Sequence, residues 1–146
     1  MNNSEIVATC EIEKDIDSVF SFIFDPKNKP MVMPDLISVS NISDVPLKLG
    51  STFNFVFQMA GVSLNGIWEV TSVNKPIYYE ATTTGDIESV WRYKLAKLED
   101  KTNLSLTITY TPPKSVLGAM KGLVLSQVNK RVAELYLKNI KTILET

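Results

Sequence analysis

The chain has 146 residues, of which 45% are hydrophobic and 21% are charged, and its formal net charge is −1. This length is typical of one domain and this composition is typical of globular proteins, which excludes disordered, collagen-like and disulfide-scaffold classes. The nearly balanced charge argues against electrostatic binding of the whole chain to nucleic acid. We therefore expect a single domain over residues 1–146 with no nucleic-acid partner.

The first part of the chain has the pattern of a strand followed by two short helices. Residues 5–13 alternate between apolar and polar side chains, as a strand does. Asp15 or Asp17 can then cap a short helix that Asp25-Pro26 ends. The next stretch, 27–34, contains two prolines and is expected to form a second short helix or a turn.

The middle of the chain has the pattern of an antiparallel meander. Turn signals such as Ala60-Gly61 and Gly85-Asp86 separate segments in which apolar residues alternate. Strands that are consecutive in sequence and joined by tight turns pair antiparallel. The last segment is the clearest, because Leu104, Leu106 and Ile108 alternate with serine and threonine. Strands are expected near 36–42 and over 51–59, 62–73, 77–84, 87–98 and 103–111.

One long helix is expected to close the chain. Pro112-Pro113 stops the last strand, and Ser115 is available as a helix cap. No proline intervenes from there to Glu145, and apolar residues recur every three or four positions, which predicts an uninterrupted amphipathic helix. Gly118 and Gly122 in its first turns indicate close packing against the sheet or, alternatively, a loosened segment that lets cargo pass. The apolar stripe consists of Leu117, Met120, Val124, Val128, Val132, Tyr136, Ile140 and Ile143.

The residue types that are missing exclude several kinds of chemistry. The sequence contains no histidine, which rules out Ser-His-Asp and Cys-His catalysis and metal sites built on imidazole. It has neither a glycine-rich dinucleotide motif nor a P-loop. The single cysteine, Cys10, has the same parity as Ile6 and Ala8, so we expect an inert thiol in the core. We expect no metal, no cofactor and no catalytic set.

The sequence also carries expectations about location. Residues 1–5 lack the basic region and the apolar core of a signal peptide. No apolar run approaches the roughly 18 residues that a membrane-spanning helix needs. A single cysteine cannot form an internal disulfide, which agrees with a reducing compartment. These features predict a soluble, cytoplasmic protein.

Wrapping a curved sheet around a terminal helix leaves room for a cavity, and strand parity predicts its walls. Phe53, Phe55 and Phe57 share one face of their strand. Such bulky rings can fill a core completely, which is one interpretation; the other is that the helix stripe cannot fill so long a sheet, leaving a pocket of roughly a few hundred Å³. The predicted ligand-binding residues are Phe53, Phe55, Phe57, Met59, Leu64, Trp68, Tyr79, Trp91, Tyr93, Ile108, Tyr110, Leu117, Met120 and Val124.

Within this set, some side chains have particular expected roles. Tyr110 is the preferred polar anchor, because it ends its strand beside the turn into the long helix. Met120 and Val124 are the expected gate residues. Flexible Met31 and Met33 would suit an adaptable lining, although methionine also serves as ordinary core filler.

The C-terminal segment, residues 112–146, is the one place where charge is uneven. It holds six basic and two acidic residues, a local balance of +4. A solvated helix face with contacts between Glu134 and Lys138 and between Lys141 and Glu145 explains this charge. The alternative is transient contact with an anionic membrane.

Several short motifs follow one another in a familiar order. They are Asp17-Ser18-Val19-Phe20-Ser21-Phe22, Asp25-Pro26-Lys27-Asn28, Met33-Pro34-Asp35-Leu36, Leu49-Gly50-Ser51, Glu69-Val70-Thr71-Ser72-Val73 with Pro76, Lys101-Thr102-Asn103-Leu104-Ser105-Leu106 with Tyr110 and Pro112, and Asn139-Ile140-Lys141. Over nearly the whole chain, this order resembles the START-like, or SRPBCC, superfamily, and most of all its polyketide cyclase/dehydrase and lipid-transport branch. The resemblance implies an α+β helix-grip fold. In that fold a seven-stranded curved antiparallel sheet wraps around a long C-terminal helix and a hydrophobic tunnel, with two short helices between strands 1 and 2.

The resemblance does not imply one activity, because similar proteins carry lipids or hormones, cyclise or dehydrate polyketides, or act as co-chaperones. Our favoured hypothesis is binding or transport of a lipid-like or aromatic small molecule. The alternative is a cyclase or dehydratase, which would need an inward carboxylate with a raised pKa. A pocketless interaction protein, including a homodimer, is the third hypothesis. The candidate carboxylates are Glu69, Glu80, Glu88 and Asp35.

Overall fold

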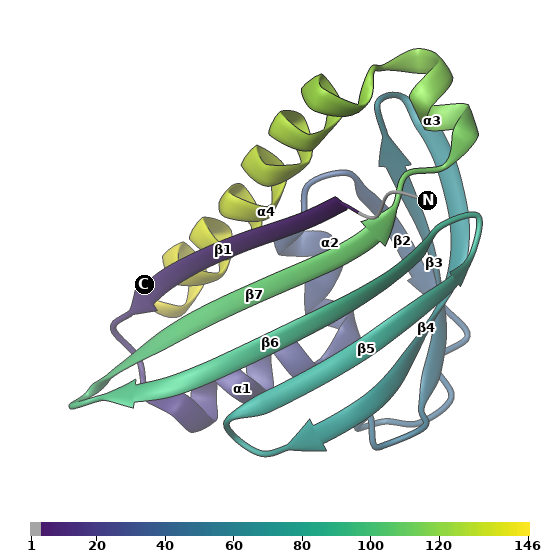
Figure 1. The fold of residues 1–146 in the computed structure, drawn as a ribbon. Coiled ribbons are helices and arrows are strands. Elements are labelled where there is room, and N and C mark those ends of the chain that lie inside the picture. Colours follow the sequence, from purple (N-terminus) through teal and green to yellow (C-terminus); the bar gives the residue numbers. More distant parts are fainter. Residues whose placement is uncertain (1–3) are drawn as a thin grey trace.

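A strongly curved sheet forms the body of the molecule (Figure 1). The computed structural model describes residues 4–146, and within them seven strands form one antiparallel sheet in the order β1-β7-β6-β5-β4-β3-β2. The part of the predicted domain and N-terminal stretch that falls on residues 1–3 lies outside the described residues. The strands are β1 (Ser4–Ile12), β2 (Leu36–Ser40), β3 (Thr52–Met59), β4 (Val62–Asn74), β5 (Tyr78–Gly85), β6 (Glu88–Leu98) and β7 (Lys101–Thr111).

The helices lie in two groups along the chain. Between β1 and β2 come α1 (Ile16–Phe24), a single 3-10 turn η1 (Pro26–Asn28) and α2 (Lys29–Val32). After β7 come α3 (Lys114–Ala119) and α4 (Gly122–Leu144). Figure 1 shows α1, α2 and α4 on one side of the sheet, which curves around them. This arrangement confirms the predicted α+β helix-grip fold.

Alternation of side chains builds the interior of the sheet. In β7, Leu104, Leu106, Ile108 and Tyr110 are buried, while the residues between them remain partly accessible. The edge strand β1 pairs with β7 across the whole of its length and presents Ile6 and Ala8 to the same core. Cys10 is only partly buried against that core, and this burial raises the pKa of its thiol, which disfavours the reactive thiolate.

The prediction of an uninterrupted C-terminal helix is wrong near the start of that helix. Met120 and Lys121 have extended backbone angles and separate α3 from α4. Gly118 and Gly122 flank this break, and two glycines within five residues weaken a helix by about 1 kcal/mol each. Leu117 in α3 and Val124 in the first turn of α4 are exposed rather than inward. The buried face of α4 consists of Leu125, Ala133, Tyr136, Leu137 and Ile140.

Capping interactions fix the two short helical segments before β2. The Asp15 carboxylate accepts a hydrogen bond from Ser18 N at 3.1 Å at the start of α1, as the sequence predicted. Asp25 ends α1 and accepts from Lys27 N at 3.0 Å, which starts the next turn. Asn139 of α4 donates its amide hydrogen to Val32 O at 2.9 Å and holds α2 against the long helix.

The end of α4 is tied to the edge of the sheet. Lys141 Nζ lies 2.7 Å from Glu145 Oε2, which confirms the predicted contact of this pair. Lys141 Nζ also donates to Glu11 O, and Glu145 accepts from Glu13 N, each at 2.8 Å.

Across residues 4–146, no helix combines the length and the apolar character that crossing a membrane would require.

Candidate ligand-binding site

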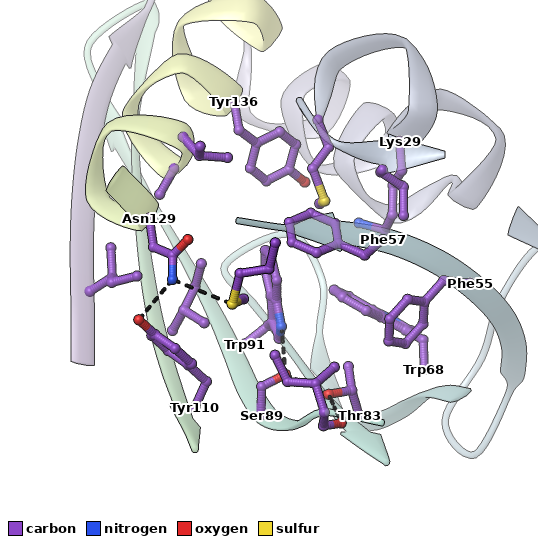
Figure 2. A pocket seen from close by; sticks show the side chains of 18 of the residues that line it. Lys29, Phe55, Phe57, Trp68, Thr83, Ser89, Trp91, Tyr110, Asn129 and Tyr136 are labelled. Carbon is purple, nitrogen blue, oxygen red and sulfur yellow. Dashed lines mark hydrogen bonds between the residues drawn. The ribbon is translucent and has the colours of Figure 1, made fainter. Parts of the chain in front are cut away.

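A cavity of about 70 Å³ lies between the concave face of the sheet and α4, and it is partly open to solvent. Figure 2 shows the side chains that surround it, most of which are rings or aliphatic groups. The cavity is smaller than the predicted few hundred Å³, because large aromatic side chains occupy much of the space that the curved sheet encloses. It is nevertheless large enough for more than one water molecule.

Strand parity correctly placed part of the predicted wall. Phe53, Phe55 and Phe57 project from β3 into the lining, and Phe53 stacks on Trp68 of β4 at 5.6 Å between ring centroids. The predicted residues that line the cavity are Phe53, Phe55, Phe57, Met59, Trp68, Trp91, Ile108 and Tyr110. Whether they contact a ligand stays a prediction.

The other predicted residues do not line the cavity. Leu64, Tyr79 and Tyr93 are fully buried in the packed core. Leu117 and Val124 are exposed on the surface, and Met120 lies partly buried in the break between α3 and α4. The expected gate formed by Met120 and Val124 is therefore not part of the cavity wall.

Eleven further residues line the cavity beyond the predicted ligand-binding set. Of these, Met33 was expected as adaptable lining, and Val132 and Tyr136 were expected in the apolar stripe of the helix. Asn129 could have been found from the helical spacing, because it lies one turn before Ala133. Lys29 had no signal, because lysine is rarely buried. The added lining residues are Ile6, Lys29, Met33, Leu36, Thr83, Ile87, Ser89, Asn129, Val132, Ala133 and Tyr136.

Tyr79 and Tyr93 form a structural layer behind the cavity rather than its wall. Their rings stack with centroids 5.1 Å apart. Trp68 Nε1 donates to the Tyr79 hydroxyl at 2.8 Å, and the Tyr93 and Tyr136 hydroxyls are 2.9 Å apart. Burial raises the pKa of Tyr79, Tyr93 and Tyr136, so their hydroxyls stay protonated. Protein side chains therefore satisfy these polar groups without a ligand.

A second chain of hydrogen bonds satisfies the polar groups at the β5–β6 end. Trp91 Nε1 donates to Ser89 Oγ at 3.0 Å, and Ser89 Oγ lies 2.5 Å from Thr83 Oγ1. Thr83 Oγ1 in turn donates to Ile87 O at 3.2 Å. Since Thr83 uses its one hydrogen in this way, Ser89 must be the donor between the two hydroxyls.

The pair formed by Tyr110 and Asn129 retains free hydrogen-bonding capacity. Asn129 Nδ2 donates to the Tyr110 hydroxyl at 2.8 Å and also lies 3.6 Å from the sulfur of Met59. Among residues 4–146, the hydroxyl hydrogen of Tyr110 and the amide oxygen of Asn129 have no hydrogen-bond partner. Figure 2 shows this pair at one side of the cavity.

Lys29 brings a buried amine to the other side of the cavity (Figure 2). Only 2% of the residue is exposed, and its Nζ atom lies 3.4 Å from both Ile23 O and the Tyr93 hydroxyl. The same atom lies 4.6 Å from the centroid of the Trp68 ring. Burial lowers the pKa of Lys29 to about 7, against the opposing effect of the Asp25 carboxylate.

A curved sheet that wraps around a long helix, with an apolar cavity between them, is the arrangement of helix-grip proteins. Residues 4–145 match the family model for polyketide cyclase / dehydrase and lipid transport, and the chain belongs to this family. The match confirms the predicted START-like superfamily. Among curated proteins, no sequence relative was found.

Solved structures share the fold at low sequence identity. The protein TTHA0849 from Thermus thermophilus superimposes with a TM-score of 0.80 at 14% identity, with 94% of each chain covered. A START superfamily protein from Mycobacterium smegmatis gives 0.78 at 14% identity, with 97% of each chain covered. The di-domain ARO/CYC StfQ from the steffimycin biosynthetic pathway gives 0.76 at 10% identity, covering 98% of this chain and 51% of StfQ.

Proposed function

We propose that the chain binds and carries a small hydrophobic molecule in the cavity between the sheet and α4. The observation that carries the proposal is the composition of the wall: rings and aliphatic side chains, interrupted by a few polar atoms such as those of Tyr110 and Asn129. Pockets that bind small molecules have this composition, with many apolar contacts for affinity and a few polar groups for orientation.

Burial of apolar surface is the main source of affinity at such a wall. A ligand that covers roughly 300 Å² would gain several kcal/mol before the entropic cost of association, at about 25 cal/mol for each Å². A cavity of about 70 Å³ holds only part of such a ligand. Met33 and Met59, which line it, have flexible side chains that can move to admit more.

An enzyme of the cyclase or dehydratase kind receives less support. Glu69, Glu88 and Asp35 are exposed, and Glu80 is paired with Arg92 at 3.5 Å. None of these carboxylates lines the cavity. General acid–base chemistry on a bound polyketide requires a proton-transferring group within reach of the ligand, so the carboxylates considered do not supply it.

The wall and one structural neighbour support an aromatic or chain-like ligand. Trp68 and Trp91, with centroids 5.2 Å apart, offer faces to which flat rings or methylene chains can pack. StfQ is an ARO/CYC of a biosynthetic pathway, which is in keeping with an aromatic or polyketide-like ligand here. A pocketless interaction protein would require a filled core, and homodimer formation stays a prediction.

Native mass spectrometry of the gently purified protein should detect a bound molecule of a few hundred daltons. Organic extraction would release it for identification. Addition of a polyketide-like substrate should give a bound species without turnover. Chemical conversion of that substrate would instead favour the enzyme.

Filling the cavity should weaken ligand binding without unfolding the protein. Ala133 is buried on α4 and lines the cavity, so the larger side chain of Ala133→Leu would occupy the space of a ligand. We expect an affinity for the uncharged dye N-phenylnaphthylamine at least about tenfold lower, measured by its fluorescence. Ala96→Leu makes the same change at an exposed position of β6 and should bind as the wild type does. Equal binding by Ala133→Leu would contradict the proposed location.

A further inference from the structure

We propose that Lys29 recognises an acidic group, so that the ligand of this cavity is an amphipathic acid whose carboxylate pairs with the lysine ammonium. This inference rests on the proposed function of the cavity and adds the chemical class of its ligand. The acid would sit at the Lys29 side, with its apolar part along the aromatic wall.

The protein leaves the Lys29 charge without a counter-ion. Within residues 4–146, no carboxylate oxygen comes within 4.0 Å of Lys29 Nζ. The Asp25 carboxylate is the charged group that acts on it, and it does so from beyond ion-pair distance. A buried ammonium is normally paired, because its removal from water is unfavourable unless an anion or strong acceptors replace the water.

The hydrogen bonds that Lys29 does make are few and long. An ammonium has three donors, yet Nζ has two protein acceptors, Ile23 O and the Tyr93 hydroxyl, both at the long distance of 3.4 Å. The remaining interactions are with the faces of Trp68, Tyr79 and Tyr93, at 4.6, 5.7 and 5.3 Å. These rings favour a cation without neutralising it. One strong acceptor is therefore missing from the site.

A ligand in the cavity could reach the Lys29 amine. Lys29 is itself part of the cavity wall, as is Trp68 beneath its amine. Figure 2 shows the Lys29 nitrogen directed toward the space that the lining side chains enclose. An acid that enters the cavity would meet the amine in a setting of low polarity, where a charged hydrogen bond is strongest.

Proton uptake should accompany this recognition. The pKa of Lys29 is about 7 in the empty site, and a bound carboxylate would raise it. The groups that face the amine are Tyr79 and Tyr93, whose raised pKa keeps them neutral, and the Asp25 carboxylate acts on it from beyond ion-pair distance. The affinity for an acid should therefore fall about tenfold for each pH unit above pH 7.

The test is isothermal titration calorimetry with octanoic acid and with octanol, an uncharged molecule of the same chain length. Each compound is titrated into the wild type, Lys29→Met and Lys27→Met. The wild type at pH 7 should bind the acid at least about tenfold more tightly than the alcohol. Lys29→Met should lose this preference while retaining the alcohol. Lys27→Met removes an exposed lysine two positions away and should behave as the wild type.

The outcomes separate the two proposals. If Lys29→Met binds octanoic acid as tightly as the wild type, Lys29 is not the acid site and the proposed function stands. A wild-type affinity that is constant from pH 7 to pH 9 would contradict the coupled uptake of a proton. If the wild type binds neither compound, both proposals fail for this ligand class. Should Lys29→Met not fold, Lys29→Gln decides the same question.

Discussion

Replacement of Lys29 by methionine is expected to remove a rise in the free energy of unfolding that the wild type shows between about pH 7 and pH 10. The lysine pKa is lowered from 10.5 to about 7 by burial, so in this range the unfolded chain binds one proton more than the folded protein. Folding stability therefore increases with pH, by about 1 kcal/mol for each pH unit. Below pH 7 both states are protonated, and the full unfavourable effect of burying the charge is present.

Urea unfolding followed by tryptophan fluorescence at several pH values would measure this effect. The informative quantity is the difference between wild type and Lys29→Met, since groups common to both, including Cys10 and the buried tyrosines, cancel. We expect Lys29→Met to be the more stable protein at pH 6 by a few kcal/mol, and the difference to shrink as the pH rises. Lys27→Met should track the wild type. Parallel curves for wild type and Lys29→Met would show that the amine keeps its ordinary pKa in the fold.

The fold was predictable because its strands repeat one simple rule. In β7, each apolar residue from Leu104 to Tyr110 has a polar neighbour, and the structure buries the apolar ones. Turns at Gly61 and Gly85, both with positive φ, lie where the sequence placed them. The helix break was not predictable from periodicity, because Leu117, Met120 and Val124 keep helical spacing across it. Only the paired glycines pointed to it.

The candidate site was predictable on its sheet side and much less on its helix side. Strand parity alone decides which face of β3 carries Phe53 and Phe55. On the helix side, a stripe read at steps of four residues drifts around a helix of about 3.6 residues per turn. Val132 and Tyr136 of the predicted stripe therefore line the cavity, whereas Val124 does not and Asn129 and Ala133 do. The burial of Lys29 depends on tertiary structure. A four-residue helix that contains Pro30 and precedes the edge strand β2 gives no sign that its lysine is turned inward.

Substitution of Gly66 by alanine is expected to destabilise the fold and to disturb the cavity at the same time. Gly66 of β4 pairs with Phe55 of β3 and lies under its ring. A Cβ atom at this position would lie 2.5 Å from Phe55 Cζ and 2.7 Å from Thr84 O. The ring can move but the Thr84 carbonyl belongs to the neighbouring strand, so the sheet itself must shift, and overpacking of this kind costs about 1–3 kcal/mol.

A matched glycine and a double variant make this prediction specific. A Cβ at Gly118, within α3, would meet no atom within 4 Å, so Gly118→Ala should be neutral or stabilise by up to about 1 kcal/mol. Combining Gly66→Ala with Phe55→Leu relieves the contact with the ring but not the one with the Thr84 carbonyl. Urea unfolding should therefore show that Gly66→Ala lowers the free energy of unfolding by less in the Phe55→Leu protein than in the wild type, though not by zero. Since Phe55 lines the cavity, Gly66→Ala should also weaken binding of the dye N-phenylnaphthylamine. A Gly66→Ala protein that is as stable as the wild type and binds the dye normally would contradict the close packing around Gly66.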